Sequence, residues 1–202
     1  MREQRIIDLL KEHRYLERSM IQQRFFTFKT GERKSKSVLL RMYQRDMVSR
    51  FRCGRGEYIY HLGKKSQKWA HWLDLNRFHF SLLSDLKQWQ KIIYFDFEVR
   101  YPYGQADALY IIKLTLDGIG LSFFLEMDDG GNKFQKVEQY MSYYQSKVWA
   151  KEWWGQSFPL VVIVTPRTRE IRELVKRVKA EKFFRVIEKR QEYKDIIKQV
   201  RG

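Results

Sequence analysis

The spacing of the apolar residues changes once within the first 62 residues, from the period of a helix to that of a strand. In three short runs, over 6–10, 15–26 and 35–43, apolar side chains recur every three or four positions, which predicts three amphipathic helices. Over 48–62 they alternate with polar ones on either side of a turn that contains two glycines, which predicts a β-hairpin. Three helices followed by a hairpin favour a winged helix-turn-helix domain over 1–62.

The positive charge of the chain is concentrated in this N-terminal region. Residues 1–70 carry 18 Lys and Arg against 7 Asp and Glu, and the other 132 residues carry 22 against 17, within a net charge of +16. In a winged helix-turn-helix the third helix enters the major groove and the hairpin lies along the backbone, so this charge favours double-stranded DNA as the partner. A solvated face, or a face that docks a protein, is the competing interpretation. The candidate DNA-binding residues are Lys34, Lys36, Arg41, Gln44 and Arg45 on the third helix and its approach, and Arg50, Arg52 and Arg55 on the hairpin.

Residues 63–76 are expected to link this domain to a second one over 77–202. The second domain has helix and strand patterns in the order α-β-β-β-α-β-α-β-α, which predicts a small mixed sheet covered by helices and an α+β or α/β class overall. The expected helices are 78–89, 133–151, 167–180 and 190–200, and the expected strands are 92–101, 107–116, 119–127, 159–164 and 183–187.

Three acidic residues lie on two neighbouring strands of the second domain. Asp107 begins one strand, and Glu126 and Asp128 stand two residues apart at the end of the next, where side chains at i and i+2 point the same way. The element order and these positions resemble the PD-(D/E)XK nuclease fold, in which acidic residues bind a divalent metal and a Lys assists. The resemblance implies that Asp107, Glu126 and Asp128 hold Mg²⁺ or Mn²⁺ and serve the cleavage of a phosphodiester.

The lysine of that pattern is displaced in this chain, because Asp128 stands where the resemblance expects Lys. Lys133 and Lys136, at the start of the following helix, are the nearest replacements. The alternative interpretation is that 128–131 is an ordinary polar turn, that Glu126 pairs with a Lys or Arg, and that the domain is a non-catalytic scaffold.

Two short segments extend the resemblance to a family. With the basic winged helix, the segments ADALYII at 106–112 and FFLEMDDGG at 123–131, followed by KVEQYMSYY at 136–144, resemble the replication-relaxation family of bacterial plasmid and mobile-element proteins. The family more often has Pro before the strand Asp, where this chain has Gln105-Ala106. The resemblance implies binding at an origin-like DNA site and a role in replication, relaxation or mobilisation. The positions that carry over are Asp107, Glu126, Asp128 and Gly130, with Tyr140 and Tyr143 or Tyr144, although the helical spacing of the tyrosines favours core packing.

Several functional classes are excluded by what the sequence lacks. The single Cys53 permits no internal disulfide, and no Cys and His residues stand at zinc-ligand spacing. No Gly-x-x-x-x-Gly-Lys-Ser/Thr loop is present, which excludes a P-loop ATPase. The absence of an apolar run long enough for a signal peptide or a membrane span predicts a cytoplasmic protein with no membrane partner.

The leading hypothesis is a homodimeric, sequence-specific double-stranded DNA-binding protein that acts in plasmid or mobile-element replication or relaxation. Two alternatives stay open. One is a divalent-metal-dependent DNA endonuclease or nickase that uses Asp107, Glu126 and Asp128 with Lys133 or Lys136. The other is a dimeric transcriptional regulator whose second domain only dimerises.

Overall fold

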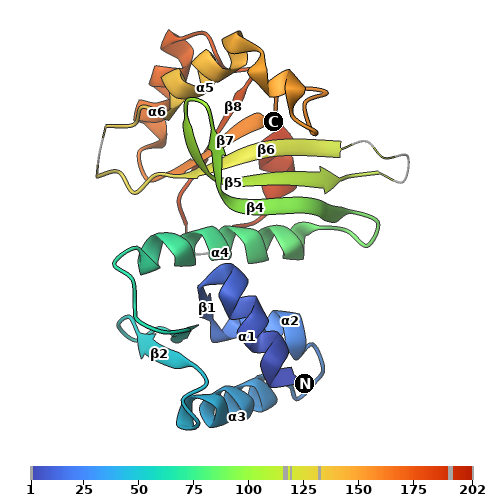
Figure 1. The fold of residues 1–202 in the computed structure, drawn as a ribbon, viewed down its shortest axis with the longest axis vertical. Helices are drawn as coiled ribbons and strands as arrows, with labels where there is room; N and C mark the ends of the chain where they lie inside the picture. The colour runs from blue at the N-terminus through green and yellow to red at the C-terminus, as the bar shows by residue number, and fades with distance from the viewer. Residues whose placement is uncertain (1, 116–117, 119, 132, 191–192, 202) are drawn as a thin grey trace. The chain divides into compact units, whose positions relative to one another are not determined.

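The computed structural model describes residues 2–115, 118, 120–131, 133–190 and 193–201 (Figure 1). The chain divides into two compact units, Met1–Phe80 and Ser81–Gly202, here called the N-terminal and C-terminal units. Within the described residues these units contain seven α-helices, a three-stranded sheet and a five-stranded mixed sheet. The predicted mixed α/β class is therefore confirmed.

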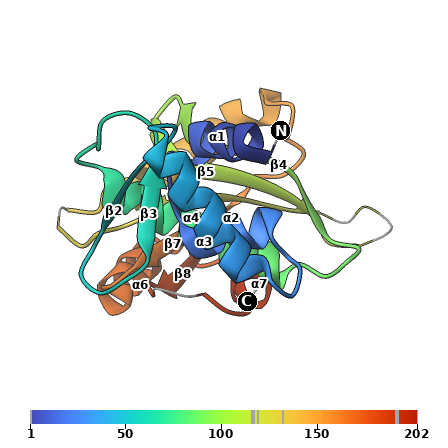
Figure 2. The same cartoon turned by 90° about the horizontal axis from the view of Figure 1, so that it is seen from below.

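The N-terminal unit combines short helices with the three-stranded sheet. Its elements are α1 (Arg2–His13), β1 (Tyr15–Glu17), α2 (Arg18–Phe25), α3 (Gly31–Gln44), β2 (Ser49–Arg52), β3 (Tyr58–His61) and the first part of α4 (Trp69–Asp85). The strands pair antiparallel in the order β1-β3-β2, with Tyr15 opposite His61 and Arg50 opposite Tyr60. Figure 2 shows α3 running beside β3 and β2, which places the helix next to the hairpin.

The prediction of one helix over 15–26 is wrong for its first three residues. Helix α1 ends at His13, and Arg14 adopts a positive φ of 62° that turns the chain into β1. Leu16 is fully buried and lies opposite Tyr60 of β3. A three-residue strand is too short to show an alternating period, and its hydrogen-bond partner lies far along the chain, so local spacing gives no signal for it.

Helix α4 begins at Trp69, inside the expected linker over 63–76, and its first part belongs to the N-terminal unit. The side-chain amide of Asn76 donates to the carbonyl oxygens of His13, at 2.7 Å, and Tyr15, at 2.8 Å. Its Oδ1 lies 2.7 Å from Nδ1 of His13. These buried bonds tie α4 to the end of α1, and the division between the two units falls within the helix rather than before it.

The C-terminal unit is built on the five-stranded sheet. Its strands are β4 (Lys91–Tyr101), β5 (Gly104–Lys113), β6 (Gly120–Met127), β7 (Leu160–Thr165) and β8 (Phe184–Glu188), and its helices after α4 are α5 (Lys136–Ser146), the 3₁₀ helix η1 (Val148–Lys151), α6 (Thr168–Arg177) and α7 (Ile196–Arg201). The strand order is β4-β5-β6-β7-β8; the first three strands pair antiparallel, and β6, β7 and β8 pair parallel. The predicted order of helices and strands over 77–202 is confirmed.

Two expected helices in this unit have different bounds in the structure. The predicted helix over 133–151 is interrupted at Lys147, whose φ of 55° ends α5 before η1 begins. The expected helix over 190–200 begins only at Ile196. The strand ends and turn predicted at Leu116, Asp117 and Ile119 lie outside the described residues.

The core of the C-terminal unit holds one side of α5 and α6 against the sheet. Val137 and Tyr140 of α5, and Val175 of α6, are buried against Phe124 of β6 and Ile163 of β7. β7 is apolar along its length because it lies between two parallel neighbours, where both faces are buried. This packing brings the C-terminal ends of β6 and β7 side by side, close to the start of α5.

Candidate functional sites

The N-terminal unit has a cavity of about 480 Å³ between α3 and the β2–β3 hairpin. Cationic side chains from three separate segments line it. Leu40 and Tyr58 supply an apolar part of the wall. The cations that converge here are Arg18 of α2, Lys36 of α3, and Arg50, Arg52 and Arg55 of the hairpin.

A series of cation–π contacts, called the stack below, connects the arginines of this cavity to tyrosines of α3 and the hairpin. The guanidinium carbon of Arg50 lies 4.3 Å from the ring centre of Tyr43 and 4.0 Å from that of Tyr58. The guanidinium carbon of Arg52 lies 4.0 Å from the ring centre of Tyr58. The order Tyr43, Arg50, Tyr58, Arg52 therefore joins α3 to both strands of the hairpin by cation–π contacts.

The solvent-facing residues of α3, with Arg45 just after it, fall on three sides of the helix when successive side chains are placed at about 100° per residue. Lys36 and Tyr43 face the hairpin. Lys34, Arg41 and Arg45 lie on the opposite side and line a separate cavity of about 400 Å³ with Arg2 and Glu3 of α1. The helical positions place Arg33, Ser37, Leu40 and Gln44 between these two sides, and all four are exposed.

The cations predicted from the sequence are thus split between two cavities, and they differ in their internal partners. Arg41 donates to Oε1 of Glu3, from Nη2 at 2.6 Å and from Nε at 3.1 Å, and this hydrogen bond lowers the pKa of Glu3. Lys36 lies 2.7 Å from Glu32, whose pKa it lowers in the same way. Across the described part of the chain, the hairpin arginines Arg50, Arg52 and Arg55 form no salt bridge.

Sequence reasoning missed the non-cationic members of this surface. Leu40 and Tyr43 are each 41% exposed on α3, and Tyr58 faces the same way as Arg52, its partner in the strand register. Leu40 could have been found from the sequence, because its helical position lies outside the buried apolar side of α3 formed by Val38, Leu39 and Met42. No local signal marks Tyr58 as a stacking partner, because its contacts come from another strand.

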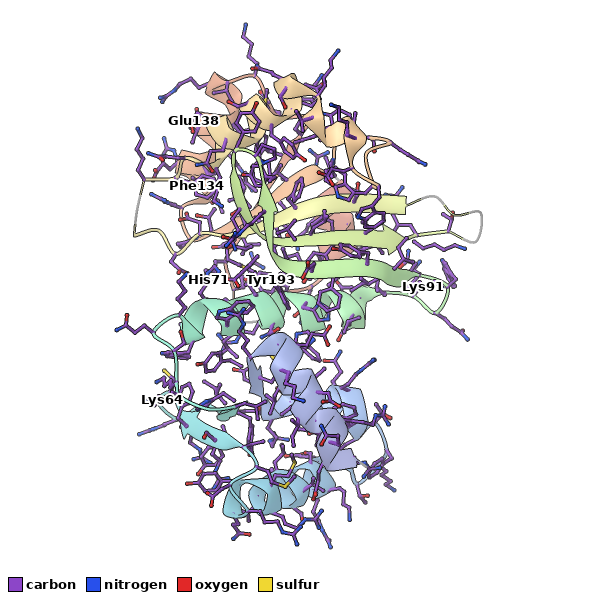
Figure 3. All side chains as sticks on the ribbon, in the orientation of Figure 1. Lys64, His71, Lys91, Phe134, Glu138 and Tyr193 are labelled. Carbon is purple, nitrogen blue, oxygen red and sulfur yellow. The ribbon has the colours of Figure 1, made fainter. Side chains whose placement is uncertain are left out.

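The C-terminal unit has a cavity of about 370 Å³ at the end of β6. Asp107 and Glu126 line it from the sheet. Lys136 and Gln139 line it from α5, and Phe134, labelled in Figure 3, lines it from the segment just before α5. Lys133 and Asp128 also belong to its wall.

Glu126 is the deepest ionisable group of this cavity, with 2% of its surface exposed. Its Oε1 accepts a hydrogen bond from the Tyr140 hydroxyl at 2.6 Å, and its Oε2 lies 3.1 Å from Nζ of Lys136. Burial raises the pKa of Glu126 to about 8, and the nearby charge of Asp107 adds to this effect, while Lys136 and Tyr140 act against it. Near neutral pH the group therefore lies close to its own titration point.

Asp107 and Lys136 are held by the backbone around Glu126. Oδ2 of Asp107 accepts a hydrogen bond from the backbone N–H of Met127 at 2.7 Å. Lys136 also donates to the carbonyl oxygen of Gln105, just before Asp107. Two carboxyl groups and one ammonium group thus meet at the junction of β5, β6 and α5.

Asp128 is held away from this group by a second set of contacts. Its Oδ2 accepts from the Thr165 hydroxyl at 2.6 Å and from Nε of Arg167 at 2.8 Å, and its Oδ1 accepts from Nη2 of Arg167 at 3.1 Å and from the backbone N–H of Gly130 at 3.0 Å. Burial alone would raise its pKa, but the hydrogen bonds from Arg167 and Thr165 outweigh burial and lower it.

The three predicted carboxylates therefore do not form one cluster. Among the residues that the structure describes, no group of three His, Cys, Asp or Glu side chains is arranged to hold a metal ion. Asp107 and Glu126 remain a pair beside Lys136, which is the nearer of the two replacement lysines predicted from the sequence.

Tyr140 and Tyr143, which the family resemblance carries over, are both 1% exposed and lie in the core. The Tyr101 ring stacks at 5.0 Å from each of them. Burial raises the pKa of Tyr143 to about 12 and that of Tyr140 well above the usual tyrosine value. The predicted core role of these aromatic residues is confirmed.

Comparison with protein-family models, with curated proteins and with solved structures gives no match for this chain. None of the helices in the described residues combines the length and apolarity needed to cross a membrane.

Proposed function

We propose that the N-terminal unit is a winged helix-turn-helix that binds double-stranded DNA, with α3 in the major groove and the β2–β3 hairpin along the backbone. The observation that carries the proposal is the convergence of five cations from α2, α3 and the hairpin on one cavity. Arg50 and Arg52 lie against aromatic rings instead of carboxylates, so their charge is available to an external polyanion.

The middle one of the three sides of α3 supplies the side chains that reach base edges in this proposal. Arg33 and Gln44 carry the groups that pair with guanine and adenine, and Leu40 offers an apolar contact to a thymine methyl group. Lys34, Arg41 and Arg45 on one side, with Lys36 and the hairpin on the other, contact phosphates.

The process in which this binding acts stays a prediction from the family resemblance. It places the protein at an origin-like site of a plasmid or mobile element, as a homodimer, in replication or relaxation. Half-sites spaced by a multiple of about one helical turn of DNA are expected for such a dimer.

Fluorescence anisotropy with a labelled 30-base-pair duplex taken from upstream of the protein's own gene tests DNA binding, with a shuffled duplex for comparison. We expect R50Q/R52Q to weaken binding and to reduce the magnitude of the slope of log affinity against log salt by about 2. Each lost phosphate contact reduces the magnitude of that slope by about 0.9. The matched control is R169Q/K176Q, which removes two exposed cations from α6. Equal losses of affinity in the two double variants would contradict the proposal. Absence of binding by the wild type at about 50 mM salt, where phosphate contacts contribute strongly, would contradict it too.

The cavity of the C-terminal unit favours a second candidate, a divalent-metal-dependent DNA endonuclease or nickase on a PD-(D/E)XK-like fold. The specific observation is the meeting of Asp107, Glu126 and Lys136 in one cavity. Mg²⁺ is commonly bound through one or two carboxylates with several waters, and Asp107 and Glu126 fit that donor set. Such an ion, when bound, would polarise a phosphodiester and activate water.

In this second candidate the residues of the chain have separate roles. Glu126 must lose its proton to act as a ligand, and Lys136 favours the charged form at 3.1 Å. Asp107 is oriented by the backbone N–H of Met127. Asp128 is engaged by Arg167 and shapes the end of β6 instead of contributing a ligand.

Incubation of supercoiled plasmid with Mg²⁺ or Mn²⁺ separates the candidates. Nicking that disappears in E126Q but persists in E173Q, a change at an exposed carboxylate of α6, would support the enzyme. A DNA mobility shift without nicking, indifferent to E126Q and to metal, would support a binding protein or a dimeric transcriptional regulator.

A further inference from the structure

The stack of Tyr43, Arg50, Tyr58 and Arg52 gives the DNA-binding surface a fixed internal geometry. The Arg50 guanidinium carbon lies 4.3 Å from the ring centre of Tyr43 and 4.0 Å from that of Tyr58. The Arg52 guanidinium carbon lies 4.0 Å from the ring centre of Tyr58, and Arg52 is exposed. A guanidinium held flat on a ring loses little freedom when a ligand binds its edge.

The arginines share one face of β2 because they stand at i and i+2. Tyr58 and Tyr60 lie opposite Arg52 and Arg50 on β3, so the same face carries both arginines and both rings. The hairpin edge of this face opens into the cavity that Lys36 and Arg55 also line. Planar guanidinium groups with a supported face and an open edge match the two oxygens of a phosphate group.

We propose that this stack is a phosphodiester clamp, in which Arg52, supported by Arg50, binds a backbone phosphate of the DNA through the guanidinium edge. Tyr58 and Tyr43 are positioning residues that act through the two arginines. The inference rests on the proposed DNA binding and adds that planar geometry, and not only positive charge, sets the affinity of the hairpin. The stack also fixes the hairpin relative to α3, so that base and phosphate contacts keep one register.

Substitutions that separate geometry from charge test the clamp, with the same 30-base-pair duplex and the full-length protein. R52K keeps the charge but removes the planar fork, and we expect it to lower affinity about 5-fold, close to the loss in R52Q. Y58L removes the ring that both arginines contact, and we expect about a 10-fold loss of affinity. Y58F keeps the ring and is expected to restore affinity to within about 2-fold of wild type.

The thermal unfolding midpoint of each variant is measured alongside its affinity. Y43L changes an exposed ring at the end of the stack and supplies a second variant if Y58L fails to fold. Wild-type affinity in both R52K and Y43L, with loss only in R52Q, would overturn the clamp and leave DNA binding intact. Absence of duplex binding by the wild-type protein would overturn the proposed function and the clamp together.

Discussion

The arginines of the hairpin and the carboxylates of the C-terminal cavity have opposite kinds of neighbour. Arg50 and Arg52 lie on tyrosine rings, whereas Glu126 and Asp128 lie against Lys136 and Arg167. A ring supports a guanidinium without cancelling its charge, so the hairpin remains cationic toward solvent. An ion pair largely compensates the charges of both partners in a buried site.

This difference separates a surface whose cations are open to an external anion from a cavity whose carboxylates Glu126 and Asp128 already have cationic partners. The hairpin residue Glu57 pairs with Arg18, but among the described residues Arg50, Arg52 and Arg55 form no ion pair that a ligand would have to displace. In the C-terminal cavity, any cation that binds Glu126 must compete with its proton and with Lys136. The changes below test the comparison, from the largest expected effect to the smallest.

Removal of Asp128 breaks the most complete internal pairing. In D128A the Arg167 guanidinium loses its carboxylate, and we expect the C-terminal unit to lose about 3 kcal/mol of unfolding free energy. The control is D129A at the next position, where the carboxylate is exposed and lies 2.5 Å from Lys189, and where we expect less than about 1 kcal/mol. Urea unfolding measures both, and equal losses would show that Asp128 is no better compensated than a surface group.

Replacement of Glu126 by Gln should stabilise the protein at high pH. The folded pKa, about 8, lies above the ordinary 4.5, so the native state binds more protons between these values. The stability from this group is fully present below pH 4.5 and is lost as pH rises through 8. We expect E126Q to gain about 2 kcal/mol at pH 8 relative to wild type and nothing at pH 4. A gain independent of pH in urea titrations would contradict the raised pKa.

A buried imidazole in the N-terminal unit gives the opposite pH dependence. Burial, with the neighbouring His13, lowers the pKa of His79 from 6.5 to about 3, so the unfolded state binds more protons between these values. This contribution to stability is present above pH 6.5 and is lost as pH falls toward 3. We expect the free energy of unfolding to fall by about 1 kcal/mol between pH 7 and 5.5, measured by urea unfolding followed by circular dichroism. H79L should flatten this part of the profile, and an unchanged slope would assign it to another group.

The smallest expected effect concerns a cation that already has an internal partner. Arg41 is hydrogen bonded to Glu3, so R41Q should weaken duplex binding less than 2-fold, on the order of the small contribution of an engaged surface charge. R52Q, at a position without such a partner among the described residues, should weaken it about 5-fold. A larger loss in R41Q than in R52Q, measured by anisotropy, would move the main phosphate contacts to the α1 side of α3.

The order of helices and strands could be predicted from the sequence because the spacing of apolar residues within each short segment indicates its secondary structure. Apolar spacing identifies α3 and the hairpin strands, and a continuous apolar run identifies β7. The same local reasoning placed Asp107 and Glu126 on neighbouring strands, which do lie side by side. It also named Lys136 among the replacement lysines, without a means of choosing it over Lys133.

Tertiary packing decided everything that depends on partners distant in the sequence. Strand β1 exists because β3 pairs with it, and α4 joins the N-terminal unit because Asn76 bonds to the end of α1. Asp128 lines the same cavity as Glu126, but its carboxylate accepts hydrogen bonds from Arg167, just before α6. The sequence by itself determined which groups line each strand and helix; only the folded chain determined which of them meet, because short-range periodicity carries no information on long-range contacts.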